Sequence, residues 1–170
     1  VVVADLASSP DELAVTADQC AGSTIMTQFD VTNSADVGRA LDSVVSQVGV
    51  PDLVFNNAGY QGALANTLDY PEDDVRRVLD INVVGVFLVL QEFARNLIAA
   101  GIPGAVVNTA SMAHGGAPNM AAYSASKAAV IALSKTAAKD LAHHSIRVNS
   151  VSPAFIGPGE MWDRQVQLQA

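Results

Sequence analysis

Short apolar runs alternate along this chain with segments of helical character, and this alternation restricts the fold more than any other feature. The apolar runs cover residues 1–6, 23–31, 51–59, 104–111 and 146–154, and the helical segments cover 9–21, 33–49, 71–101 and 120–144. Segment 71–101 is either one long helix or two joined helices. Continuous apolar strands are typical of parallel sheets covered on both faces, and parallel neighbours need a crossover helix between them. The sequence therefore predicts a doubly wound α/β fold with a parallel sheet.

Signals at the helix boundaries support this interpretation. Ser9 is placed as an N-cap before Pro10, acidic residues open segment 71–101, and Gly101 closes it. The chain contains no internal repeat, low-complexity tract or linker. Residues 1–170 are therefore expected to form a single domain.

Composition excludes several classes of protein. Hydrophobic residues make up 50% of the 170 positions and charged residues 15%, which is typical of a globular chain. A net charge of −8 without any basic run argues against nucleic-acid or membrane partners and favours a small-molecule ligand. Cys20 is the single cysteine and the histidines show no ligand spacing, so no metal site is predicted. No secretory signal or run of membrane-spanning length is recognised, and a cytoplasmic location is expected.

Polar residues, glycine and proline follow the predicted strands. In chain order, the strand ends hold Asp5, Asp30, the run Asn56 to Gly59, Ser111 and Pro153. Each of these has an ordinary structural role as well, because Asp and Asn are common in turns and caps and Gly permits a positive φ. However, ligands of doubly wound sheets bind outside the carboxyl ends of the strands. The gathering of these residues at one edge therefore predicts a ligand site there.

Tyr123 and Lys127 begin the helix after the fourth strand, so they lie at the same edge. Residues at i and i+4 share a helical face, and the phenol and the ammonium can therefore occupy one site. An ammonium beside a phenol is expected to lower the pKa of Tyr123 from about 10 toward neutrality, the range that a general acid or base needs. The alternative is that both are ordinary surface groups, and the residues at the strand ends favour the shared site.

Four features in this order resemble the classical short-chain dehydrogenase/reductase family: "NNAG" at 56–59, Asn82 within "DINVVG", Ser111, and the pair Tyr123-x-x-x-Lys127. The resemblance covers the whole chain and implies a Rossmann-like sheet and a nicotinamide cofactor. Segments 55–71, 108–127 and 155–170 further resemble the bacterial xylitol dehydrogenases and their polyol-oxidising relatives.

The resemblance implies a role for each residue at this edge. Tyr123 takes the proton of the substrate hydroxyl, Lys127 lowers the pKa of Tyr123 and holds the nicotinamide ribose, and Ser111 hydrogen-bonds the substrate oxygen. Asn82 holds a water that links Lys127 to solvent, or alternatively is a capping residue or a kink in its helix. The further cofactor contacts are Asp5, Leu6, Asp30, Val31, Asn57, Ala58, Gly59, Pro153 and Ile156.

Asp5 predicts the choice of cofactor. A carboxylate at this position can accept hydrogen bonds from the adenosine ribose hydroxyls and would repel a 2′-phosphate. The first Arg of the chain is Arg39 and the first Lys is Lys127, so no nearby cation is available for a phosphate. NAD is therefore predicted in preference to NADP. Alternatively Asp5 only caps the loop that follows, a task that Ser8 and Ser9 could also perform.

The resemblance also implies a substrate and an assembly. A xylitol-like polyol, oxidised at a secondary hydroxyl, would contact Ser111 and Tyr123 together with Gln61, Asn119, Met120 and the segment that holds Glu160, Met161 and Trp162. Helices 79–100 and 121–142 carry apolar residues on more than one side. A homo-oligomer is therefore predicted, by resemblance a tetramer.

The chain departs from the family pattern in two ways. Ala154 follows Pro153 where relatives usually have Gly, which affects the turn at the nicotinamide. No glycine-rich phosphate loop occurs, and the family's first and last strands have no counterpart, so a fragment or the ordered part of a longer enzyme is expected. Two other functions stay open: a 3-oxoacyl-type carbonyl reductase, and a non-catalytic remnant that acts as an assembly module.

Overall fold

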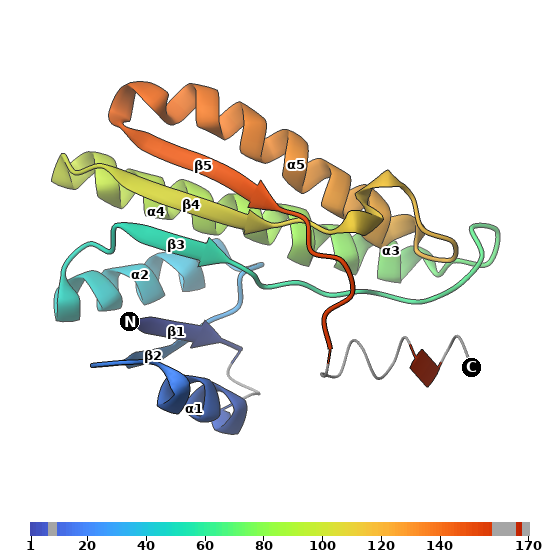
Figure 1. Cartoon of the computed structure of the whole chain (residues 1–170), viewed down its shortest axis with the longest axis horizontal. Coiled ribbons are helices and arrows are strands. Elements are labelled where there is room, and N and C mark those ends of the chain that lie inside the picture. The colour runs from blue at the N-terminus through green and yellow to red at the C-terminus, as the bar shows by residue number, and fades with distance from the viewer. Residues whose placement is uncertain (7–9, 158–165, 168–170) are drawn as a thin grey trace.

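The computed structural model describes residues 1–6, 10–157 and 166–167 (Figure 1). Strands and helices alternate as the sequence predicts: β1 (Val2–Asp5), α1 (Pro10–Gln19), β2 (Ile25–Gln28), α2 (Ser34–Val48), β3 (Leu53–Asn56), α3 (Glu72–Leu79), α4 (Val86–Ala100), β4 (Gly104–Thr109), α5 (Ala121–Leu141) and β5 (Ile146–Val151). The expected cap at Ser9, with Ser8, and the expected substrate residues Glu160, Met161 and Trp162 lie outside the described residues.

Every strand pairing in the described structure is parallel, which confirms an α/β, Rossmann-like fold. Strand β1 pairs with β2, and β3, β4 and β5 form a second sheet in that order. No ladder of hydrogen bonds joins β1 to β3 within the described ranges. Figure 1 shows β1, β3, β4 and β5 pointing the same way, so their carboxyl ends lie at one edge.

The core lies between the second sheet and helices α4 and α5. Val54, Val106 and Val148 are register partners across the three strands, and Val106 and Val148 are buried. They pack with Leu90, Phe93 and Leu97 of α4 and with Ala137 of α5. Because side chains alternate along a strand, this row faces the helices and the residues between point to the other face.

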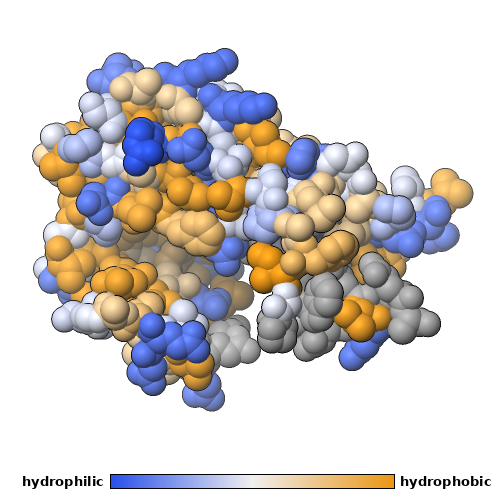
Figure 2. Space-filling model, viewed as in Figure 1, coloured by the Kyte–Doolittle hydropathy of each residue, from blue (hydrophilic) through white to orange (hydrophobic). Residues whose placement is uncertain are grey.

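Among the described residues, that other face of the second sheet has no covering helix, whereas the sequence predicts a sheet covered on both sides. Leu53 is 59% exposed and Phe55 is 57% exposed, and the space-filling view shows apolar residues gathered over these strands (Figure 2). The reason is topological. The connections β3 to β4 and β4 to β5 step in the same direction across the sheet, and right-handed crossovers in one direction place their helices on one face.

Helices α3 and α4 are continuous through a π-helical turn at Asp80–Gly85, so the long segment is one helix with an irregular centre. It ends at Gly101, whose φ of 66° is left-handed, as the sequence indicates. By length and composition alone, Glu72–Ala100 could cross a membrane, which differs from the expectation that no segment reaches that length. Its apolar character has a structural cause, because Val86, Leu90 and Phe93 are buried in the core.

Candidate active site

Tyr123 and Lys127 occupy the first two turns of α5 and are buried, at 7% and 2% exposure. The Lys127 Nζ lies 5.6 Å from the centre of the Tyr123 ring, so the i, i+4 spacing places both groups at one site as predicted. Nζ donates a 2.7 Å hydrogen bond to the backbone oxygen of Thr109, the last residue of β4. The alternative of two ordinary surface groups is therefore wrong.

The expected lowering of the Tyr123 pKa does not appear in this structure. Burial raises the pKa of Tyr123 above its ordinary value, and a hydrogen bond with Ser111 acts in the opposite direction. Burial also lowers the pKa of Lys127 to about 8. The physical reason is that both groups lose water, and each then favours its neutral form.

Ser111 follows β4 and opens the short 3₁₀ helix Met112–Gly115 as its N-cap. Its hydroxyl accepts a 3.2 Å hydrogen bond from the backbone N–H of Ala113, and it lies close enough to the Tyr123 phenol to act against the rise in that pKa. The next residue, Met112, donates its backbone N–H to the oxygen of Pro153 at 3.0 Å. This bond brings the predicted cofactor residue Pro153, after β5, beside the Ser111 turn.

Asn82 lies within the π-helical turn and is fully buried. Its amide nitrogen donates to the backbone oxygen of Tyr60 at 2.9 Å and to the Ser126 hydroxyl at 3.0 Å, and its oxygen accepts the Tyr60 N–H at 2.7 Å. Asn82 therefore ties the segment after β3 to α5. Because Asn82 lies in an irregular turn of its helix, the alternative of a kink in the helix also applies to it. The water that Asn82 is expected to hold stays a prediction.

Asn57, Ala58 and Gly59 follow β3 as an exposed edge beside this network. A Cβ on Gly59 would lie 3.5 Å from both the Asn82 Oδ1 and the Lys127 Nζ, so the backbone passes close to both groups. The Asn57 side chain accepts a hydrogen bond from the Thr109 hydroxyl at 2.9 Å. Lys127 has three donor hydrogens and one protein acceptor in the described structure. This arrangement fits the ribose hydroxyls of a nicotinamide cofactor, which would accept hydrogen bonds from the remaining N–H groups of Lys127.

The other predicted cofactor residues lie apart from this centre, on the β1–β2 pair and after β5. Asp5 is exposed and its Oδ1 accepts the backbone N–H of the adjacent Leu6 at 2.7 Å. The Asp30 Oδ1 accepts both the backbone N–H and the hydroxyl of Thr32, and Asp30 is thus held in its own turn. A Cβ on Gly85 would meet the Val31 side chain at 2.7 Å. Ile156 is 69% exposed.

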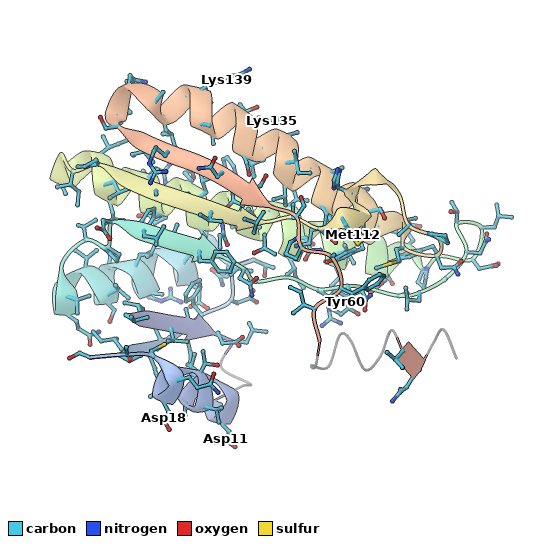
Figure 3. The ribbon with its side chains drawn as sticks, viewed as in Figure 1. Asp11, Asp18, Tyr60, Met112, Lys135 and Lys139 are labelled. Carbon is cyan, nitrogen blue, oxygen red and sulfur yellow. The ribbon has the colours of Figure 1, made fainter. Side chains whose placement is uncertain are left out.

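The expected substrate residues lie on two loops that meet. Gln61 is 3% exposed and follows Tyr60. Asn119 has a positive φ of 62°, and its backbone oxygen accepts the Ala65 N–H at 3.0 Å. Met120 precedes α5, and its backbone oxygen accepts the Ser124 N–H at 2.8 Å. Figure 3 shows Tyr60 and Met112 at the carboxyl end of the strands, with Lys135 and Lys139 on the outer side of α5.

Three residues of this network carry no signal in the sequence that marks them as functional. Thr109 accepts from Lys127 through its backbone, which no side-chain pattern can indicate. Ser126 bonds Asn82 from one position before Lys127, and the small residues around it conceal that role. Asp74 accepts hydrogen bonds from the segment after Gly59, although its place among the acidic residues of the first turn suggested only a favourable helix dipole.

Comparisons with known proteins agree on the family. The short chain dehydrogenase family matches residues 1–169. A borneol dehydrogenase of Lavandula x intermedia is 39% identical over 92% of this chain, and an L-2,3-butanediol dehydrogenase of Corynebacterium glutamicum is 33% identical over 96%. The chain spans 59% and 64% of the lengths of those two enzymes.

Solved structures give the same result. A crystal structure of NAD+-bound xylitol dehydrogenase is 48% identical, with a TM-score of 0.92 over 99% of this chain and 65% of that one. A crystal structure of levodione reductase is 30% identical, with a TM-score of 0.80 over 90% of this chain and 60% of that one. Fold, motifs and these matches together establish that the chain belongs to the short-chain dehydrogenase family.

Proposed function

We propose that the protein is an oxidoreductase that interconverts a secondary alcohol and a ketone, with Tyr123 as the acid/base. The observation that carries this proposal is the meeting of Tyr123, Lys127 and Ser111 at the carboxyl edge of the sheet. A nicotinamide cofactor, when bound, supplies the acceptor or donor of the hydride. The residues of this chain transfer the proton and hydrogen-bond the substrate oxygen.

In the oxidative direction, Tyr123 must first lose its own proton; its phenolate oxygen then takes the proton of the alcohol O–H bond, while the hydrogen of the C–H bond leaves as hydride to the acceptor that the cofactor supplies. In the reductive direction, the Tyr123 hydroxyl gives its proton to the ketone oxygen. The Ser111 hydroxyl, near the Tyr123 phenol, would donate to the same substrate oxygen and stabilise its developing charge. Lys127 lies beside Tyr123, and burial lowers its pKa to about 8.

We propose NAD as the cofactor and a polyol such as xylitol as the substrate. The exposed carboxylate of Asp5 supports NAD, since the sequence that follows β1, Leu6 to Ser9, contains no Arg or Lys. The similarity to a xylitol dehydrogenase crystallised with NAD+ supports both parts. The relatives with other named substrates, such as borneol and 2,3-butanediol, are named for secondary alcohols of the same reactive type.

The test is an assay of the full-length protein with NAD or NADP against a panel of polyols, terpene alcohols, diols and 3-hydroxyacyl compounds. We expect NAD reduction with polyols, and Tyr123→Phe should lower kcat by at least about 100-fold with little change in cofactor affinity, because only the transferable proton is lost. Lys135→Met is the control, because it removes an exposed cation on the outer side of α5 and should leave kcat unchanged. Reduction of acyl substrates alone would favour the 3-oxoacyl alternative, and an active Tyr123→Phe variant would refute the assigned role.

A further inference from the structure

The carboxylate of Asp74 is the centre of a cluster that the proposed chemistry does not use. Its Oδ1 accepts the Tyr60 hydroxyl at 3.1 Å, and its Oδ2 accepts the Tyr70 hydroxyl at 3.3 Å and the backbone N–H of Ala63. These four residues are called the Asp74 cluster below. Asp74 lies in the first turn of α3, and its three donors all belong to the loop between β3 and that helix.

The loop is pressed against α3 at the glycine between Tyr60 and Ala63. Gly62 has a φ of 76°, and a Cβ there would lie 2.5 Å from the Val78 Cγ2, 2.7 Å from the Tyr70 hydroxyl and 2.8 Å from the Asp74 Oδ2. Only glycine fits such a position, both for its backbone angle and for its contacts. The Arg77 guanidinium also lies 4.5 Å from the centre of the Tyr60 ring. Segment 60–63 therefore has one closely packed position on α3.

The same segment is connected to both sides of the active site. At one end, Asn82 holds the backbone N–H and C=O of Tyr60, beside Lys127. At the other end, Ala65 donates to the backbone oxygen of Asn119, in the loop that leads into α5 and Tyr123. Asp74 anchors the stretch between these two attachments, 14 residues from Tyr60 in the sequence.

Gln61 lies within this stretch and has a buried side chain whose amide group is unpaired among the described residues. The side chain is 3% exposed, and neither its amide oxygen nor its amide nitrogen has a partner in the described part of the chain. An unpaired buried amide is destabilising, so the backbone anchors on either side must keep it there. A hydroxyl of a ligand can both donate to and accept from such an amide.

We propose that Asp74 is a positioning residue, which fixes segment 60–65 as the substrate-side wall between Asn82 and Asn119 and presents Gln61 to a hydroxyl-bearing substrate. The expected effect on substrate binding rests on the proposed function. The anchoring of segment 60–65 by Asp74 does not depend on it. Asp74 touches no reacting atom in this scheme. Its effect should therefore fall on the binding of the substrate rather than on the proton transfer.

The experiment compares Asp74→Ala with Asp73→Ala in the full-length protein. Asp73 is the exposed neighbour with no side-chain hydrogen bond to the described residues, so its replacement removes an equal charge without touching the cluster. Hydrogen exchange of the Tyr60, Ala63 and Ala65 amides is measured by NMR, and KM and kcat for xylitol are measured with saturating NAD. For Asp74→Ala we expect at least about tenfold faster exchange and at least about tenfold higher KM, with kcat lowered less than KM is raised.

Conservative variants keep the proposal testable if Asp74→Ala does not fold. Tyr60→Phe removes one hydrogen bond of the cluster and keeps the ring over Arg77. Asp74→Asn retains an acceptor for Ala63 and Tyr70, while its NH₂ group can donate to the Tyr60 oxygen, so its exchange rates and KM should fall between those of the wild type and Asp74→Ala.

The outcomes separate this inference from the proposed function. Unchanged amide exchange in Asp74→Ala would overturn the positioning role. Faster exchange with an unchanged KM would overturn it too, because the cluster would then stabilise the loop without affecting substrate binding. A wild-type protein that oxidises no alcohol, yet shows faster exchange in Asp74→Ala, would refute the proposed function and the presentation of Gln61 to a substrate. The anchoring of the segment would then stand alone.

Discussion

Lys127 is a long, charged side chain at 2% exposure with a single protein acceptor among the described residues. Loss of water disfavours the ammonium, and this is the cause of its pKa of about 8 against an ordinary 10.5. Tyr123 beside it has a raised pKa, so Lys127 is the first of the two to lose its proton as the pH rises. Above about pH 8 the pair therefore consists of a neutral Lys127 amine and a Tyr123 phenol that still carries its proton.

This order of titration predicts a dependence of stability on pH. Between pH 8 and 10.5 the unfolded chain binds the Lys127 proton and the folded chain does not, so the free energy of unfolding rises with pH across that window. The contribution is smallest below the folded pKa, where the buried ammonium destabilises the fold fully. From about pH 7.5 to about pH 9.5 the gain should be roughly 2 kcal/mol, since each pH unit contributes up to about 1.4 kcal/mol.

Urea unfolding of the wild type and of Lys127→Met at both pH values measures this contribution as a difference between the two proteins. Lys135→Met serves as the control, because Lys135 is exposed on the same helix. If Lys127→Met followed the same pH dependence as the wild type, the lysine would not titrate in this window.

Asp5 carries the prediction about the cofactor. Its carboxylate is exposed at the end of β1 and accepts a local bond from Leu6. Asp5→Ser combined with Leu6→Arg removes the charge that repels a 2′-phosphate and adds a cation that attracts one. The ratio of kcat/KM for NAD to that for NADP should fall by at least about tenfold, which corresponds to about 1.4 kcal/mol. A wild-type enzyme that prefers NADP would show that Asp5 has only its capping role.

At the scale of elements, the long helix and the loop after β2 meet at one close contact. Gly85 ends the π-helical turn with an ordinary helical φ of −59°, and a Cβ there would lie 2.7 Å from the Val31 side chain. The glycine is required by the approach of Val31 rather than by its backbone angle. This contact helps to hold the β1–β2 pair, with Asp30 and Val31, against the part of the chain that carries Asn82.

Gly85→Ala should therefore destabilise the fold by about 1–3 kcal/mol, the range of overpacked positions. Val31→Ala in the same chain should recover part of that loss, which a double-mutant cycle in urea would measure. Gly38→Ala is the matched control, because Gly38 lies in α2 and a Cβ added there would have no other atom within 4 Å, and the substitution should stabilise that helix by up to about 1 kcal/mol. A Gly85→Ala variant as stable as the wild type would mean that Val31 moves freely.

At the scale of the whole molecule, apolar side chains remain on the outer side of the long helix. Val84 is 44% exposed, Phe87 40% and Ile98 39%. Their neighbours Val86, Val89 and Leu90 fill the core, so the helix has two apolar sides, as the sequence indicates. We propose that the outer side packs against another copy of the protein and that the full-length enzyme is a homo-oligomer, by family resemblance a tetramer.

Phe87→Glu should dissociate this assembly, because an unpaired charge in an apolar contact is unfavourable. Light scattering of the full-length protein should give the mass of an oligomer for the wild type and of a smaller species for Phe87→Glu. Val48→Glu, at an exposed apolar position that ends α2, is the control and should keep the wild-type mass. A monomeric wild type, or an unchanged mass for Phe87→Glu, would contradict the proposed contact.

The sequence alone was sufficient for the order and type of the elements, and for the parallel sheet. Hydrophobic periodicity and helix caps are local properties, so the alternation of strands and helices and the end of the long helix at Gly101 could be predicted from neighbouring residues. The meeting of Tyr123 and Lys127 was predictable for the same reason, since a single turn of helix fixes their relation. Which face of the β3–β4–β5 sheet is covered by the described residues could not be predicted, because it depends on the direction of the crossovers and not on the strands themselves.

The tertiary structure alone decided the properties that depend on groups distant in the sequence. The direction of the Tyr123 pKa follows from burial, which the fold imposes and the spacing of Tyr123 and Lys127 does not reveal. Likewise, Asn82 meets Tyr60 and Ser126, and Asp74 meets Tyr60, across 14 to 44 positions of sequence. Hydrogen bonds and loss of water act over a few ångströms in space, and no local pattern records which distant residues the fold brings within that range.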